Sequence, residues 1–266
     1  MKYINQIFKI LKKESPILYS IVMLFFSGAV ACLVALAFDD RQLAGINVWI
    51  KPFKFLISTA IYVATVGYLI TFYPYSTLKK NSIRNIVSWT LLLELGIIVY
   101  QAARGVPSHY NGSTAFDAML FAGMGILIGI NVLIMVLFII DTIRLKLALG
   151  RPVQFAILIG WIVVFFGSWI GGTMISQMAH NVGVADGGDG LPLLNWSTVA
   201  GDLRIAHFFG LHGIQLIPLF AFWIGHKWNI KKSHQLRYIL LFGLFYSSWI
   251  AFTFYQAKSG IPLIRL

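Results

Sequence analysis

Seven apolar stretches, each long enough to cross a bilayer, constrain this chain of 266 residues more than any motif does. A helix needs about 20 apolar residues to cross the hydrocarbon core. None of the stretches alternates polar and apolar residues as a transmembrane strand would, so all seven are predicted to be helices. They lie near residues 17–38, 52–73, 85–103, 116–140, 154–175, 204–225 and 236–256.

The overall composition agrees with an integral membrane protein. Only 11% of the residues are charged and 58% are hydrophobic, whereas soluble domains carry about 25% charged residues. We expect a single polytopic membrane domain over residues 1–266, an all-α bundle of seven transmembrane helices. Residues 1–15 (MKYINQIFKILKKES) are predicted to form a cytoplasmic amphipathic segment ahead of an uncleaved first span.

The distribution of charge predicts the orientation. Short cytoplasmic loops are enriched in Lys and Arg, and 14 of the 21 basic residues fall on the side that holds the N-terminus. The N-terminus is therefore expected in the cytoplasm and the C-terminus on the extracytoplasmic side. Six of the nine acids are expected on the outer side: Asp39, Asp40, Asp117, Asp186, Asp189 and Asp202.

The net charge of +12 indicates affinity for anionic lipid headgroups rather than for nucleic acid, because the basic residues are split among short segments that flank spans. The expected location is a bacterial inner (plasma) membrane. Gly125 and Gly129 form a GxxxG pattern in the fourth span, which predicts helix packing and makes an oligomer through this small-residue face possible.

The stretch GDLRIAHFFGLHGIQLIPL, residues 201–219, changes from a polar start to an apolar end. It follows a long Gly-rich outer loop, residues 176–203, between the fifth and sixth spans, and loops of this length are often functional. On a continuous helix at 100° per residue, Arg204, His207, His212 and Gln215 share an arc of about 140°. Lipid penalises such an arc, so these side chains are expected to line an outward-opening cavity, with the loop as its lid. Asp202 is predicted to be the helix N-cap.

The third predicted span offers a second set of polar residues. Glu94 and Gln101 lie seven residues apart and therefore share a helix face. Glu94 is the only acid deep inside a span, which makes it a functional hypothesis by default. Its expected partner is His212 or Asn131, and the alternative is a protonated carboxyl that is simply hydrogen-bonded. Arg104 follows at the outer end of the same helix.

One interpretation is a haem-binding membrane oxidoreductase, with haem b as its cofactor. A Gly-rich outer loop that leads into a helix with a histidine near its outer end resembles the layout of haem-handling membrane oxidoreductases. His207 would supply one axial nitrogen and His109 or His180 the other. The groups expected near the propionates are Arg104, Arg204, Lys51 and Lys54, and those at the porphyrin edge are Phe208, Phe209 and Trp196.

A second interpretation is an intramembrane metal hydrolase. Seven spans with several His and Asp resemble the intramembrane zinc hydrolases related to alkaline ceramidases. That family has HxxxH on a late helix, whereas His207 and His212 are spaced HxxxxH. Zinc or another metal would then be held by His109, His180, Asp202 and His207, with an open position for water.

A third interpretation is a proton-coupled carrier or sensor in which Glu94 and His212 titrate. Against it stand the lack of an internal repeat and of Gly/Pro-broken helices in matched positions. A structural or partner subunit is the remaining alternative, so enzymatic activity is left open. In the functional interpretations, a small-molecule or lipid substrate is expected to arrive from the extracytoplasmic side.

Overall fold

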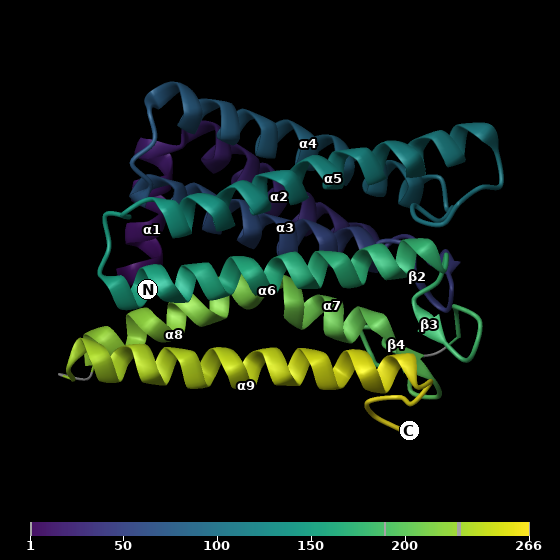
Figure 1. The fold of residues 1–266 in the computed structure, drawn as a ribbon. Coiled ribbons are helices and arrows are strands. Elements are labelled where there is room, and N and C mark those ends of the chain that lie inside the picture. Colours follow the sequence, from purple (N-terminus) through teal and green to yellow (C-terminus); the bar gives the residue numbers. More distant parts are fainter. Residues whose placement is uncertain (1, 189, 228–229, 266) are drawn as a thin grey trace. The chain divides into compact units, whose positions relative to one another are not determined.

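The computed structural model describes residues 2–188, 190–227 and 230–265, so Asp189, one of the predicted outer acids, lies outside the described residues. Within these ranges the chain is all-α apart from two short β-pairs (Figure 1). The helices are α1 Lys2–Glu14, α2 Pro16–Leu36, α3 Ile50–Leu69, α4 Thr77–Ala103, α5 Ala115–Arg144, α6 Arg151–Ser176, α7 Leu203–Leu211, α8 Gly213–Lys227 and α9 Lys232–Lys258, with a 3-10 turn η1 over Ile70–Phe72.

Six of these helices are long and apolar enough to cross a membrane, and α7 with α8 would make a seventh if the bent pair counts as one span. The predicted helical membrane protein is thereby confirmed, and each predicted span coincides with one helix or with the α7–α8 pair. The third span starts earlier than predicted, at Thr77, because the hydroxyl of Ser76 caps the helix by accepting a hydrogen bond from the N–H of Lys79 at 3.3 Å.

The predicted continuous helix over 204–225 is wrong. The chain leaves helical geometry at His212, and α7 and α8 meet at an angle of 45°. Pro218 lies inside α8. Because proline has no N–H, the carbonyl of Ile214 in the first turn of α8 loses its normal helical donor. The weakened turn lies directly after the break.

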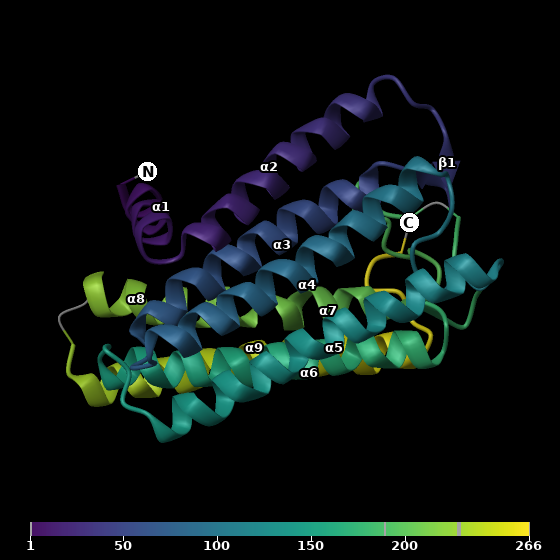
Figure 2. The same cartoon turned by 90° about the horizontal axis from the view of Figure 1, so that it is seen from above.

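The chain divides into two compact units, residues 1–134 and 135–266, which are described separately. In unit 1, α2 packs along α3 and α3 along α4, while α1 lies at the N-terminal end of α2 (Figure 2). The core of this unit consists of aliphatic side chains from the facing helices: Leu11, Val22, Ala60, Val63, Val87 and Ile98.

A small hairpin links α2 to α3. Strands β1 (Gln42–Leu43) and β2 (Ile46–Asn47) pair in antiparallel register across Ala44 and Gly45, which both have positive φ as a tight hairpin turn requires. Asp39 closes the hairpin: its carboxylate accepts hydrogen bonds from the Arg41 guanidinium and from the Trp49 indole, both at 2.7 Å. These bonds hold the pKa of Asp39 well below its usual range.

Unit 2 is built around α6, which contacts α7, α8 and α9 (Figure 1). Glycines allow α6 and α7 to cross in backbone contact. A Cβ atom added to Gly167 would lie 2.6 Å from the carbonyl carbon of Gly210, and one added to Gly210 would lie 2.5 Å from the Cα of Gly167. No side chain fits at either position, so this crossing depends on both glycines.

The glycines of the fourth predicted span behave differently. A Cβ added to Gly123, Gly125 or Gly129 would have no neighbour within 4 Å among the described residues. The predicted packing role of these glycines in α5 therefore has no counterpart within unit 1 and stays a prediction.

Candidate functional site

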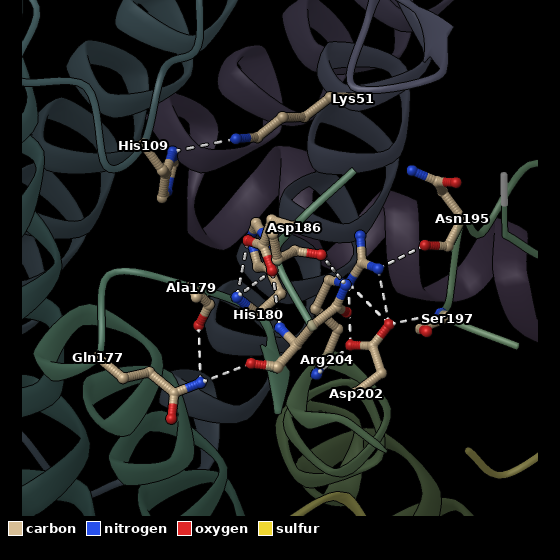
Figure 3. A network of polar contacts seen from close by, with 12 residues as sticks. Lys51, His109, Gln177, Ala179, His180, Asp186, Asn195, Ser197, Asp202 and Arg204 are labelled. Carbon is tan, nitrogen blue, oxygen red and sulfur yellow. Dashed lines mark hydrogen bonds and ion pairs between the residues drawn. The ribbon is translucent and has the colours of Figure 1, made fainter. Parts of the chain in front are cut away.

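A network centred on Asp202 lies at the N-terminal end of α7 in unit 2 (Figure 3). Asp202 is the N-cap of α7, as predicted, and its carboxylate accepts from the N–H of Arg204 at 2.9 Å and from the N–H of Ser197 at 2.9 Å. The Arg204 guanidinium donates to the same carboxylate at 2.6 Å and also to the carbonyl of Asn195. Asp202 is fully buried at its side chain. The pair therefore fixes the loop between α6 and α7 to the start of α7.

A second carboxylate organises the first part of that loop. The Asp186 carboxylate accepts from the His180 ring at 2.6 Å and from the backbone N–H groups of His180 and Asn181 at 2.8 Å (Figure 3). Burial raises the pKa of Asp186, but these hydrogen bonds outweigh it and bring the pKa to about 2. Strands β3 (Asn181–Val182) and β4 (Gly201–Asp202) then pair and close the loop. The part of the predicted lid segment that the structure describes is therefore held by hydrogen bonds of Asp186 and by the β3–β4 pair.

Aromatic side chains hold the same loop to α7. The Trp196 ring lies 5.7 Å from the ring of Phe208 and 6.4 Å from that of Phe209. The three rings that were expected at a porphyrin edge are therefore brought together, in edge-on and tilted contacts that also stabilise a protein core.

The ring of His207 is held in place by a contact with α6. Its Nδ1 atom lies 2.7 Å from the carbonyl oxygen of Gly167. A carbonyl can only accept, so Nδ1 carries the hydrogen, and Nε2 is the nitrogen left for another group. A Cβ at Gly171 would come within 2.8 Å of the imidazole Cε1, so this glycine makes the room in which the ring lies.

His212 occupies the break between α7 and α8. It is the C-cap of α7, and its carbonyl accepts from the N–H groups of Gln215 and Leu216 in the first turn of α8. Its ring lies 4.5 Å from the ring of Phe208. Since the helix bends at this residue, the predicted 140° arc holds only as far as Leu211.

Unit 1 carries a row of polar side chains along α4 and the facing part of α5. At the C-terminal end of α4, Asp117 of α5 accepts from Gln101 at 2.9 Å, from Arg104 at 2.6 Å and from the Thr114 hydroxyl at 2.7 Å. Deeper in the unit, the amide of Asn131 donates to the Thr90 hydroxyl at 2.7 Å. Side chains of two helices thus meet at two levels.

Glu94 lies between those two levels on the same face of α4, four residues after Thr90 and seven before Gln101. Its side chain is buried, with the residue 7% exposed, and its Oε2 atom has no hydrogen-bond partner among the described residues. The buried Oδ1 atom of Asn131 also has no hydrogen-bond partner among the described residues. Buried polar atoms without a partner are rare in proteins and call for an explanation such as water, an ion or a functional role.

Lys51 and His109 meet at the start of α3 in unit 1, where the Lys51 ammonium lies 3.3 Å from Nδ1 of His109 (Figure 3). The Ser108 hydroxyl lies 3.1 Å from the same nitrogen. Tyr110, the next residue, has a φ of 56°, a backbone conformation that a bulky side chain seldom adopts. Lys54 follows Lys51 by three residues and therefore lies on the same side of α3.

Within each unit, the structure brings some of the predicted residues together: Gln101 with Arg104, Lys51 with His109, and Asp202 with Arg204. It groups none of the predicted metal ligands, His109, His180, His207 and Asp202, into a cluster of three, since no group of three or more His, Cys, Asp or Glu side chains with metal-binding geometry occurs among the described residues. Asp202 uses its carboxylate oxygens for the helix cap and for Arg204 instead.

Three residues that organise these networks carried no predicted site role: Asp117, Asp186 and Gly167. Asp117 and Asp186 were placed only as outer acids. Thr114, three residues before Asp117, offered a capping signal at the start of α5. Nothing in the sequence alone pairs Gly167 with His207.

Comparison of the chain with protein-family models, with curated proteins and with solved structures gave no match.

Proposed function

We propose that this protein is a proton-coupled membrane carrier or sensor whose titrating group is Glu94. The observation that carries the proposal is the burial of this carboxyl in α4 with one oxygen unpartnered. Burying an ionised carboxylate without a partner costs several kcal/mol. Gain or loss of its proton is therefore coupled to hydration or to the approach of another group, which is the behaviour of a relay residue.

The polar row around Glu94 supports the proposal. Proton transfer between the outer surface and Glu94 would pass along Asp117 and Gln101, and the Thr90–Asn131 pair would continue the row on the other side of Glu94. Thr90, Glu94 and Gln101 lie on one face of α4, and Asn131 and Asp117 of α5 contact two of them. Such polar groups can hydrogen-bond the waters through which a proton would move.

The broken span of unit 2 is a second support. Irregular backbone at membrane depth is tolerated where it is buried in protein or lines a cavity, and secondary transporters use discontinuous helices at their substrate sites. His212 at this break is the second titrating residue in the proposal. Its role is to respond to protonation or substrate at the outer side of the membrane.

The orientation belongs to the same proposal: seven spans, the N-terminus in the cytoplasm and the C-terminus outside, in a bacterial inner membrane. The charge distribution supports this arrangement. A small-molecule or lipid substrate would enter from the extracytoplasmic side, and a second copy of the chain is the proposed occupant of the small-residue face of α5.

Proteoliposomes that contain a pH-sensitive dye test the role of Glu94. A potassium diffusion potential should drive protons inward through the wild-type protein and acidify the lumen. Glu94→Gln should lose most of this flux, while Glu94→Asp should keep a measurable part. Glu14→Gln is the matched control, because Glu14 is the same residue type in an exposed position on α1. Equal flux through wild type and Glu94→Gln would refute the role of Glu94, and no flux through wild type would refute the carrier form of the proposal.

Haem binding is the second candidate, favoured by one observation. Histidines that bind a metal through one nitrogen commonly donate the other N–H to a backbone carbonyl, and His207 makes this contact with Gly167. Its Nε2 would be the axial ligand, and a haem held there would supply electron transfer. Purified protein should then absorb in the Soret region, His207→Ala should lose the band, and His234→Ala should keep it. Elemental analysis for zinc tests the metal hydrolase in the same preparation.

A further inference from the structure

The N-terminal helix α1 is fixed against unit 1 rather than free on its surface. Leu11 is fully buried, and it packs so close to Gly67 of α3 that a Cβ there would clash with its side chain. The buried hydroxyl of Ser15, between α1 and α2, donates to the carbonyl of Gly67 at 3.3 Å. The angle between α1 and the start of α2 is therefore set by packing.

This fixed angle leaves a hollow of about 290 Å³ between the two helices. Four residues of α1 spaced as one helix face line it together with the first aromatic residue of α2: Asn5, Phe8, Lys9, Lys12 and Tyr19. The Lys12 ammonium lies 5.8 Å from the centre of the Tyr19 ring, and Phe8 meets that ring edge-on at 6.4 Å. The hollow thus has an aromatic wall and a cationic rim.

The charge of the hollow is not balanced by the protein. No acidic side chain lines it, and neither Lys9 nor Lys12 forms an ion pair within the part of the chain that the structure describes. The only acid of α1, Glu14, contacts Lys13 at 3.7 Å, and Lys13 lies outside the hollow. Two ammonium groups beside a phenol and an amide form a site for a phosphate group.

We propose that this hollow binds the headgroup of an anionic phospholipid. Tyr19 lies in the first turn of α2, at the end of a membrane-spanning helix, which is the level of the headgroups and of the aromatic belt. Basic pockets between helices at this level are suited to anionic headgroups.

The surface below the hollow favours a lipid over a free anion. Met23 and Val30 lie four and eleven residues after Tyr19 and therefore continue its face of α2. They are 42% and 60% exposed. An acyl chain whose phosphate sits between Lys9 and Lys12 would lie along these side chains, and a free phosphate would gain nothing from them. The inference goes beyond the proposed proton coupling and does not depend on it.

Native mass spectrometry of the protein in uncharged detergent tests this site. The probes are phosphatidylglycerol, phosphatidylcholine and inorganic phosphate. Phosphatidylglycerol should be retained most strongly, and excess inorganic phosphate should not displace it. Lys12→Gln and Lys9→Gln should each weaken phosphatidylglycerol binding by roughly fivefold, because one lysine near an anionic headgroup contributes about that factor.

Lys13→Gln is the matched control, since it removes the same charge from the same helix outside the hollow, and it should change binding less than twofold. Equal losses in the Lys12 and Lys13 variants would overturn the site in favour of general charge attraction. Displacement by inorganic phosphate would overturn the lipid assignment. Glu94→Gln should bind phosphatidylglycerol as wild type does, so this measurement and the flux measurement fail or succeed separately.

Discussion

Gly167 makes two different contacts with α7: its missing side chain lets the backbone of Gly210 approach, and its carbonyl oxygen lies 2.7 Å from Nδ1 of His207. A single position of α6 therefore sets both how closely α7 packs and how the His207 ring is oriented. Gly167→Ala should lower the free energy of unfolding by about 1–3 kcal/mol or more, as overpacking does, measured by thermal or denaturant unfolding in detergent.

Gly172→Ala provides the control for that experiment. It lies on the same helix, and a Cβ there would have no neighbour within 4 Å among the described residues. We expect it to leave stability unchanged or to raise it slightly, because alanine favours a helix more than glycine does. If the two variants unfold alike, the crossing of α6 and α7 is not as close as described.

Replacing Asp202 by Ala should loosen the loop between α6 and α7. The change removes the N-cap of α7 and the carboxylate that the Arg204 guanidinium contacts, at a cost of roughly 2 kcal/mol or more. Limited proteolysis should then cut within residues 183–200. Asp202→Asn should be intermediate because asparagine also caps helices, and Asp40→Ala, at an exposed aspartate, should resist the protease as wild type does.

The loop should also be sensitive to acid. The pKa of Asp186 is lowered from 3.8 to about 2. A carboxylate with a depressed folded-state pKa stabilises the fold above its unfolded-state pKa, and this contribution is lost as pH falls through the folded-state value. The protection factors of the N–H groups of His180 and Asn181 in hydrogen exchange should therefore fall between about pH 4 and pH 2. Asp186→Asn should exchange quickly already at neutral pH, with a smaller change on acidification.

Glu94→Leu should separate stability from function. Leucine removes a buried carboxyl whose Oε2 has no partner among the described residues, so the thermal stability in detergent should be equal to or higher than that of wild type. Proton flux should be lost in the same variant. A strong loss of stability would instead mean that Glu94 holds the fold together, which would count against a functional role.

A reporter fused to the C-terminus tests the proposed orientation. An alkaline phosphatase fusion should be active and a green fluorescent protein fusion dark if the C-terminus lies outside the cytoplasm. A fusion in the loop between α4 and α5 should behave in the same way, and one in the loop between α5 and α6 in the opposite way. The reverse pattern would invert every assignment of side made from the basic residues.

Sequence reasoning located the helices well because hydrophobic length is imposed by the solvent and can be counted directly. It placed the ends less well. The segment 77–84 is polar, so hydropathy gave no reason to extend the third span, although Ser76 carries a capping signal. The break at His212 was missed because the arc was calculated for a continuous helix. Pro218, which cannot donate a helical hydrogen bond, was a signal in the sequence that the helix is interrupted.

The candidate site was harder to predict, because its contacts join distant parts of the chain. Asp202 could be identified as an N-cap since that role depends on neighbours in sequence. The contact of His207 with Gly167 spans 40 residues and arises from a crossing of two helices, which no local pattern encodes. The expectation that Arg204 serves an anionic ligand overlooked Asp202, two residues before it.

The division of one span into α7 and α8 has a consequence for how the protein enters the membrane. With 9 and 15 residues, these helices are about 13 Å and 22 Å long, and each is shorter than the hydrocarbon core. We therefore expect the two helices to enter the bilayer together, as one bent segment. Because the glycines of α6 receive α7, and because α9 contacts both α6 and α7, the last quarter of the chain should reach its final packing only after α9 has been made.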